Sequence, residues 1–272
     1  MPSSYGKQSK PKNSPTFIKT RLLDENKIYQ INRSLHSVNW PYLLSLDTNK
    51  ACEELTNKLL EVLNTIDPIT LKKGTTYAPN IFNCWITKGL HLLIGRNKSK
   101  SMLADTFIIN NKYTSNKNHI SNGFCKYFTG VGEQFASGIS PSINTFDHYL
   151  KGKSYDKTFY FNPTDHIEIE QIITSLKNKR SCGHDGISSQ FLKDIKVEVS
   201  EGIAIVINKS LATGVVPGIL KIAKVNPIYK SKDSQHCANY RPISLLPVIS
   251  KLLGKVVHKR LYYMQNMFFP SQ

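Results

Sequence analysis

The sequence predicts an α+β fold that is mostly helical and contains one short β-hairpin. Several stretches carry apolar residues at the three- and four-residue spacing of an amphipathic helix. Two short β-type segments, residues 222–229 and 241–246, flank a polar stretch in the pattern typical of a hairpin. Of the 272 residues, 40% are hydrophobic, which is enough for a core and argues against disorder over the whole length. We expect one or two compact regions.

No apolar run reaches the roughly 18 to 20 residues of a membrane-spanning helix. The Ser- and Lys-rich start of the chain lacks the apolar stretch of a secretory signal. Cysteine is scattered and odd in number, which argues against a disulfide framework and favours free thiols in a reducing compartment. The five cysteines are Cys52, Cys84, Cys125, Cys182 and Cys237. We therefore expect an intracellular protein without a membrane partner.

The chain is strongly basic. It has 36 Lys and Arg residues against 19 Asp and Glu residues, a formal net charge of +17. From Asn208 to the end, ten basic residues and one acidic residue give a net charge of +9. Such a region attracts phosphate backbones through counterion release, without reading their sequence. The alternative is a solvated basic surface with no partner.

The first half of the chain has two predicted helices. Residues 1–20 are rich in Ser, Pro and Lys, and we expect a disordered basic tail there. A helix within Leu46–Ile66 should begin at Asp47 or Thr48 and end before Pro68. Its apolar face comprises Leu55, Leu59, Val62 and Ile66. A second helix is predicted over residues 119–135.

This second helix carries a stripe of aromatic and aliphatic residues. The stripe comprises Ile120, Phe124, Tyr127, Phe128, Val131 and Phe135. Its simplest interpretation is a face that packs against the rest of the protein. Residues 136–163 contain Gly, Ser, Pro and Asn among scattered aromatics and are interpreted as a connection between two bodies.

After this connection the helical signals become clearer. Asp165 is the candidate N-cap of a helix, with Glu168 three residues later. Its apolar side comprises Ile169, Ile172, Ile173 and Leu176. The Gly-punctuated run 181–188 predicts a turn, which leads into a short helix carrying Phe191 and Leu192.

A longer helix and the hairpin follow. The helix should bury Ile203, Ile207 and Leu211 and stop at Gly214, with Pro217 just beyond. In the first hairpin strand, Ile222–Tyr229, Pro227 restricts the segment to a sheet edge or bulge.

The hairpin partner is Arg241–Leu246, and a last helix is predicted over residues 248–264. One flank of this helix is apolar and packs, and another is cationic. The apolar flank comprises Leu252, Val256 and Leu261, and the cationic flank comprises Lys251, Lys255 and Lys259.

The hairpin segments carry a specific resemblance. The runs IAKVNPIYK (222–230) and NYRPISLLP (239–247), with Asp233 between them and Ser250-Lys251 after them, closely resemble the reverse transcriptase of non-LTR retrotransposons, especially jockey-like elements. The turn SCGHDGIS (181–188) is similar to a small-residue turn of that family, and FPSQ (269–272) to the start of its next block. The resemblance runs from about Pro163 to the end. Weaker similarity at residues 84–89 and 124–132 resembles the linker between endonuclease and polymerase domains.

The resemblance implies an RNA-directed DNA polymerase with a right-hand fold. Residues 163–272 would form the fingers and the start of the palm, and residues 21–162 a helical linker region. The implied partners are an RNA template, a DNA primer and a deoxynucleoside triphosphate, and the implied location is the nucleus. The oligomeric state is left open.

Polymerases of this family use two Mg²⁺ ions held by palm aspartates. The sequence contains no Asp-Asp dipeptide, and the resemblance places the catalytic blocks beyond Gln272. We therefore expect a fragment that is inactive alone, with no catalytic residue, metal site or cofactor of its own.

By their positions in the motif, Lys230, Lys232 and Arg241 are similar to the basic residues that grip the triphosphate of the incoming nucleotide. Arg presents a rigid fork to phosphate oxygens and Lys a mobile point charge. Without the palm, the grip should be weak. The alternative is that the lysines belong to a solvated turn and that Arg241 caps the backbone or is ion-paired.

The cationic flank of the last helix, Lys251, Lys255 and Lys259, is a candidate contact for the template backbone. A solvated helix face is the alternative. A zinc site at Cys182 and His184, or at His236 and Cys237, is rejected because no Cys-x-x-Cys or matched His pair occurs.

Gly183 and Gly186 match no phosphate-binding fingerprint, and Asp185 is interpreted as a turn or cap residue. No ordered hydrolase signature is present. Three hypotheses remain: an inactive polymerase fragment, a residual or domesticated nucleic-acid-binding module, and a product that does not fold stably without the palm.

Overall fold

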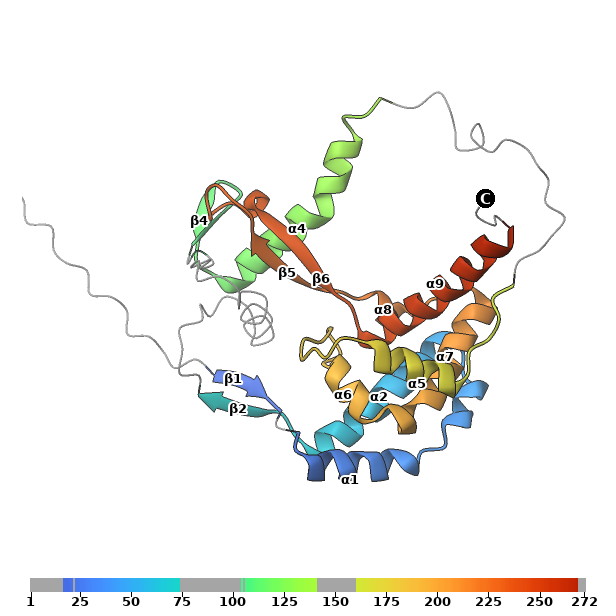
Figure 1. Cartoon of the computed structure of the whole chain (residues 1–272). Coiled ribbons are helices and arrows are strands. Elements are labelled where there is room, and N and C mark those ends of the chain that lie inside the picture. The colour runs from blue at the N-terminus through green and yellow to red at the C-terminus, as the bar shows by residue number, and fades with distance from the viewer. Residues whose placement is uncertain (1–16, 22, 74–103, 105, 141–159, 269–272) are drawn as a thin grey trace, which may run out of the picture.

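The computed structural model describes residues 17–21, 23–73, 104, 106–140 and 160–268 (Figure 1). The described chain is a mostly helical α+β structure, as the sequence predicts. It contains three two-stranded antiparallel sheets, two of which are hairpins, where the sequence predicted one hairpin. The expected linker motif at residues 84–89 and the closing residues 269–272 lie outside the described residues, as does most of the connection 136–163.

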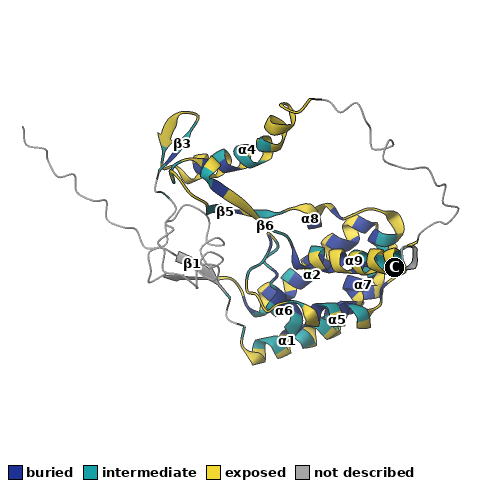
Figure 2. Cartoon of the chain, turned by 45° about the horizontal axis from the view of Figure 1, so that its top comes forward, coloured by how far each residue is buried: buried dark blue, intermediate teal, exposed yellow. Residues whose placement is uncertain are grey.

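A helical body forms the larger part of the described structure. It consists of α1 (Glu25–His36), the 3₁₀ helix η1 (Trp40–Ser45), α2 (Thr48–Ile66), α5 (His166–Ser175), α6 (Ser189–Asp194), α7 (Lys196–Thr213), α8 (Gly218–Lys221) and α9 (Val248–Phe268). Figure 2 shows the buried residues of these helices facing one another. One core cluster joins them, with Leu55, Ile169, Ile203 and Val256 among its buried members.

The ends of these helices follow from local capping. The Asp47 carboxylate accepts hydrogen bonds from the backbone N–H groups of Asn49 and Lys50, so α2 begins where the sequence predicts. Asp165 accepts from the N–H of Glu168 at 2.7 Å and caps α5 in the same way. Gly214 ends α7 in the left-handed conformation, with φ 70°, which a glycine adopts without strain.

The sequence predicts a border between a linker region and a polymerase region at residues 162 and 163. The core of the helical body contains residues from both sides of this border. Helix α1, for which the sequence analysis made no prediction, contacts α7, and η1 packs on the same helix. A Cβ atom at Gly202 of α7 would lie 2.8 Å from the ring of Trp40, and the Trp40 indole N–H donates to the Glu198 carbonyl at 2.7 Å. Residues on both sides of the border therefore share one interior.

A second cluster joins the two hairpins to α4. It involves β3 (Phe107–Ile109), β4 (Lys112–Thr114), α4 (Lys117–Ala136), β5 (Lys224–Tyr229), the 3₁₀ helix η3 (Cys237–Asn239) and β6 (Tyr240–Leu245). Phe107 is fully buried there, and Phe124 and Tyr240 are nearly so. In Figure 1 these elements lie above the helical body, and β5 and β6 run down to it.

The packing stripe of α4 is shorter than predicted. Ile120 and Phe124 are buried, and Tyr127 and Phe128 pack at the edge of the cluster. Phe135 is 72% exposed, so the prediction that it packs is wrong. The cluster reaches only the first part of α4, because Phe128 is the last residue of that helix that packs in it. Leu261 of α9 is likewise exposed, since the core contacts of that helix end near Val257.

A small sheet lies near the start of the chain. Strand β1 (Phe17–Thr20) pairs antiparallel with β2 (Thr70–Lys73), with Phe17 opposite Lys73 and Thr20 opposite Thr70. The composition of residues 1–20 predicts no regular structure, and this prediction is wrong for residues 17–20. Their partner strand is about fifty residues away, so no local pattern indicates the pairing.

Glu168 ties α9 to the start of α5. Its carboxylate accepts from Arg260 at 2.6 and 2.8 Å, from Lys259 at 2.7 Å and from the Thr164 hydroxyl at 2.7 Å. Arg260 also donates to the carbonyls of Asn162 and Pro163, each at 3.0 Å. The Arg260 hydrogen bond is the main cause that lowers the pKa of Glu168 to about 2.

We expect Glu168→Gln to destabilise the protein by about 2 kcal/mol at pH 7, because it removes the charged hydrogen bonds to Arg260. The folded pKa lies below the ordinary value of 4.5, so the stabilisation is complete above pH 4.5 and is lost as the pH falls toward 2. Thermal unfolding at pH 7 and pH 3 should therefore show a smaller acid-induced loss for Glu168→Gln than for the wild type. Glu61→Gln, which removes an exposed partner of Lys58, is the control. Equal pH dependence in Glu168→Gln and the wild type would contradict this.

Candidate nucleic-acid interface

The β5–β6 hairpin has an inner and an outer face. Tyr229 pairs with Tyr240 in the register, and Ile228 pairs with Arg241. Tyr240 packs inward, with its ring centroid 5.1 Å from that of Phe124. Because side chains alternate along a strand, Arg241 lies on the opposite, outer face, where it is exposed.

Lys230 belongs to the same outer face. Its N–H donates to the Asn239 carbonyl at 2.8 Å, which extends the hairpin ladder by one position beyond the Tyr229–Tyr240 pair. Two positions from Ile228, it therefore projects to the side of Arg241. Among the described residues, neither Lys230 nor Arg241 has an ion-pair or side-chain hydrogen-bond partner. The described residues therefore offer no carboxylate and no backbone group that would support the ion-paired or capping alternative for Arg241.

The loop between the strands is held by bonds from side chains to the backbone. Lys232 has φ 71°, in the left-handed region, and its carbonyl accepts from the Tyr229 hydroxyl. Asn239 donates to the Asp233 carbonyl at 2.7 Å, and the Tyr240 hydroxyl donates to the Ser234 carbonyl at 2.7 Å. Burial raises the pKa of Tyr240 to about 12, so this hydroxyl keeps its proton at neutral pH. The loop thus presents the exposed Lys232 from a fixed backbone.

The three lysines of α9 lie in different environments. Lys259 is ion-paired with Glu168 at 2.7 Å. Lys255 is exposed and donates to the Ser175 hydroxyl of α5 at 3.3 Å, a neutral partner. Lys251 is exposed near the start of the helix. Lys251 and Lys255 therefore keep charges that no described carboxylate pairs with, whereas the charge of Lys259 is offset.

The turn at residues 181–188 packs against the start of α9. A Cβ atom at Gly183 would lie 2.7 Å from the Pro247 nitrogen, so only glycine allows this close approach. Asp185 accepts from the Ile187 N–H at 3.3 Å, as expected of a turn residue, and burial raises its pKa. His184 lies 3.2 Å from the Ile222 carbonyl, at the approach to β5. The turn thus links the base of the hairpin to α9.

The described residues contain no group of three His, Cys, Asp or Glu side chains that could hold a metal ion. This part of the chain therefore does not fit the two-Mg²⁺ site that the resemblance implies. Within the same residues, no helix is both long and apolar enough to cross a membrane.

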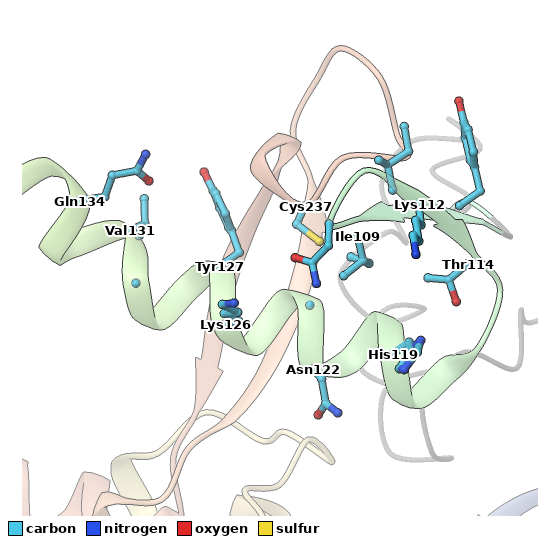
Figure 3. Close-up of a pocket in the computed structure, with 15 residues that line it drawn as sticks. Ile109, Lys112, Thr114, His119, Asn122, Lys126, Tyr127, Val131, Gln134 and Cys237 are labelled. Atoms are coloured by element: carbon cyan, nitrogen blue, oxygen red, sulfur yellow. The ribbon is translucent and has the colours of Figure 1, made fainter.

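The structure also forms a groove that the sequence analysis missed. It lies between the β3–β4 hairpin and α4, and Cys237 is also among its lining residues (Figure 3). Lys112 and Tyr113 come from the hairpin, and Lys126 and Tyr127 come from α4. No motif marks Lys112 or Tyr113. Lys126 and Tyr127 lie within residues 124–132, which weakly resemble the family's linker, and Tyr127 belongs to the aromatic stripe of α4, which we interpreted as packing.

Comparisons with known proteins agree with the family that the motifs resemble. No family model matches the chain. Over 155 residues it is 31% identical to the probable RNA-directed DNA polymerase from transposon X-element of Drosophila melanogaster, a match covering 52% of this chain and 17% of that protein. It is 27% identical over 153 residues to the RNA-directed DNA polymerase from mobile element jockey of the same organism, with the same coverage of 52% and 17%.

A third relative is a 115 kDa protein of the type-1 retrotransposable element R1DM of Drosophila melanogaster. It is 30% identical over 96 residues, which cover 35% of this chain and 9% of that protein. The chain spans less than a fifth of the length of these relatives, 17% at most among the three. It is a distant and partial homologue of the reverse transcriptases of Drosophila non-LTR retrotransposons.

Proposed function

We propose that the chain is a portion of an RNA-directed DNA polymerase of the non-LTR retrotransposon type, and that alone it binds nucleic acid without synthesising DNA. The observation that carries the proposal is the two-faced β5–β6 hairpin. Its tyrosine face is packed against α4, and its outer face presents Arg241 and Lys230 to solvent. The homology to retrotransposon polymerases supports a phosphate-bearing ligand for this basic face.

Arg241 is the main contact that we propose for the triphosphate of an incoming nucleotide, assisted by Lys230 and Lys232. Its guanidinium is a planar fork that suits phosphate oxygens, and it stands on a strand, which limits its movement. The lysines add mobile charge at the hairpin end. The grip is weak because one exposed face contributes all the contacts.

Lys251 and Lys255 are the proposed contacts for the backbone of a template strand. Both are exposed, and no described carboxylate pairs with them. Lys259 contributes less, because Glu168 offsets its charge in the folded protein. These contacts position a strand without reading its sequence.

An autonomous nucleic-acid-binding module, residual or domesticated, is the second candidate function. The observation that favours it is the burial of Val248, Ile249 and Leu252 of α9, which are at most 1% exposed within the described chain. The apolar face of this helix is covered by other parts of the same chain. This burial supports folding without further domains and speaks against the product that does not fold.

We expect the chain to bind a fluorescent single-stranded RNA 12-mer more weakly as salt is raised. Lys251→Gln/Lys255→Gln should lower the slope of log affinity against log salt by about 1.4, because each phosphate contact on a single strand contributes about 0.7. Fluorescence anisotropy at 50 to 200 mM KCl measures this slope. The double variant Lys50→Gln/Lys117→Gln removes the same charge from exposed positions elsewhere. Equal slopes for the two double variants would contradict the assignment.

Arg241→Gln should weaken the binding of a fluorescent dATP analogue, and Arg241→Lys should restore only part of it, because lysine lacks the two-pronged geometry. Anisotropy titration measures the binding, and unlabelled dATP should compete better than dAMP. Arg33→Gln, an exposed arginine of α1, serves as the control. If Arg241→Gln binds the analogue as the wild type does, Arg241 is not a triphosphate contact.

The chain should incorporate no nucleotide in a primer-extension assay with an RNA template, a DNA primer and Mg²⁺ or Mn²⁺. The physical reason is that the sequence has no Asp-Asp pair to hold the two metal ions. A retroviral reverse transcriptase under the same conditions gives the positive control. Reproducible incorporation above background would defeat the proposed inactivity.

A further inference from the structure

The outer side of α9 carries a row of basic and aromatic residues. Lys251, Lys255, His258 and Tyr262 follow one another at four-, three- and four-residue steps, which place them on one side of a helix. All four are exposed, whereas Val256, on another side of α9, is fully buried. We call these four residues the α9 row. Since a helix rises 1.5 Å per residue, the row spans roughly 16 Å.

The two rings of the α9 row are stacked on each other. The planes of His258 and Tyr262 are inclined by only 9°, and the ring centroids are 6.3 Å apart. Long side chains of a helix lean toward its N-terminus, which brings the Tyr262 ring back toward His258. Tyr262 is still 59% exposed. His258 therefore covers one face of the tyrosine ring, and much of the rest of this ring lies in solvent.

This part of α9 extends beyond the apolar core. Val257 is the last residue of the helix that packs against the core cluster among the described residues. Leu261 and Tyr263, the sequence neighbours of Tyr262, are 41% and 64% exposed. Figure 1 shows the last turns of α9 reaching toward the C-terminal end of the chain. The Tyr262 ring thus takes no part in the packing of the described core.

The charge of the α9 row favours an anionic ligand. The row contains two lysines and no Asp or Glu. Lys255 donates to the neutral Ser175 hydroxyl at 3.3 Å. Lys251 lies within electrostatic range of Asp185, but burial raises the pKa of that carboxyl group and the two residues form no ion pair within the described chain. Positive charge and a solvent-facing ring therefore occur on the same side of one helix.

We propose that the α9 row binds a single-stranded nucleic acid, with Lys251 and Lys255 on its phosphates and an unpaired base stacked on the ring of Tyr262. His258 is a positioning residue, because it supports that ring from the other side. This inference rests on the proposed function and deepens it, since it makes the strand bound at α9 an unpaired one, RNA or DNA. Basic side chains that follow the backbone, together with rings that stack on bases, bind unpaired strands. A duplex hides the faces of its bases and leaves the ring without a partner.

The stacking contact is tested by fluorescence anisotropy with a fluorescent U12 RNA. In Tyr262→Leu the affinity should fall at least about fivefold, because leucine has no ring to stack on a base. The slope of log affinity against log salt should stay unchanged, and Tyr262→Phe should restore the affinity. Tyr263→Leu is the matched control, since it removes an exposed tyrosine next to the row and should have no effect. Equal affinities for Tyr262→Leu and the wild type overturn the proposal.

Three further probes identify the ligand class. A dT12 strand should lose affinity in Tyr262→Leu as U12 does, and the wild-type affinities for U12 and dT12 show which strand the row prefers. An abasic DNA 12-mer carries the same phosphates without bases, so Tyr262→Leu should not alter its binding. A 12-bp duplex should be equally insensitive to this variant. An equal loss for the abasic strand or the duplex would show that no unpaired base stacks on Tyr262, and the proposal would fall.

The role of His258 is tested by restoring a ring without the imidazole. His258→Ala should weaken U12 binding by a smaller factor than Tyr262→Leu, because it removes only the support of the tyrosine ring. His258→Phe should recover the wild-type affinity, since phenylalanine again offers a flat surface to Tyr262. A His258→Phe variant that binds as weakly as His258→Ala overturns the positioning role.

The lysine variant separates this inference from the proposed function. A reduced salt slope in Lys251→Gln/Lys255→Gln, with wild-type U12 affinity in Tyr262→Leu, overturns the stacking and leaves the proposed function intact. Wild-type behaviour in both variants removes the α9 contact from the proposed function as well. A loss confined to Tyr262→Leu overturns the row as one site, because the phosphates then lie elsewhere. Circular dichroism melts should match the wild type, since Tyr262 lies beyond the core contacts of α9.

Discussion

The packing of Tyr240 against Phe107 and Phe124 is the contact on which the outer face of the β5–β6 hairpin depends. A two-stranded hairpin has too little buried surface to be stable alone, and α4 offers an apolar stripe that covers barely two turns. The rings join β3–β4, α4 and β5–β6 into one cluster, with centroid distances of 5.1 to 5.6 Å around Tyr240. Because neighbouring residues of a strand point to opposite faces, burying Tyr240 places Arg241 on the opposite face, where it is exposed.

The same cluster determines where the positive charge is presented. A net charge of +17 says that the chain attracts polyanions but not where they bind. The hairpin turns Arg241 and Lys230 outward, and α4 and β4 turn Lys126 and Lys112 into the groove. On α9 part of the positive charge is offset, because Glu168 forms ion pairs with Lys259 and Arg260. The earlier lysines of this helix, Lys251 and Lys255, have no ion pair with a described carboxylate.

Both clusters contain residues from either side of the border that the motifs suggested near residue 162. Trp40 packs on Gly202, and Phe124 packs on Tyr240, so each cluster combines residues from both sides of the border. Residues of the predicted linker region, 21–162, form part of each buried cluster. In this chain the part that resembles fingers is held in place by the part that precedes it.

The sequence alone determined the elements whose signals are local. Asp47, Asp165 and Gly214 place helix ends through hydrogen bonds or backbone angles within a few residues, and Pro227 with the polar loop places the β5–β6 hairpin. Tertiary structure decided what depends on distant contacts: the pairing of β1 with β2, the exposure of Phe135, the partner of Glu168 some ninety residues away, and the groove between the β3–β4 hairpin and α4. The physical reason is that capping and periodicity act over one or two turns, whereas burial and ion pairing depend on which segments the fold brings together.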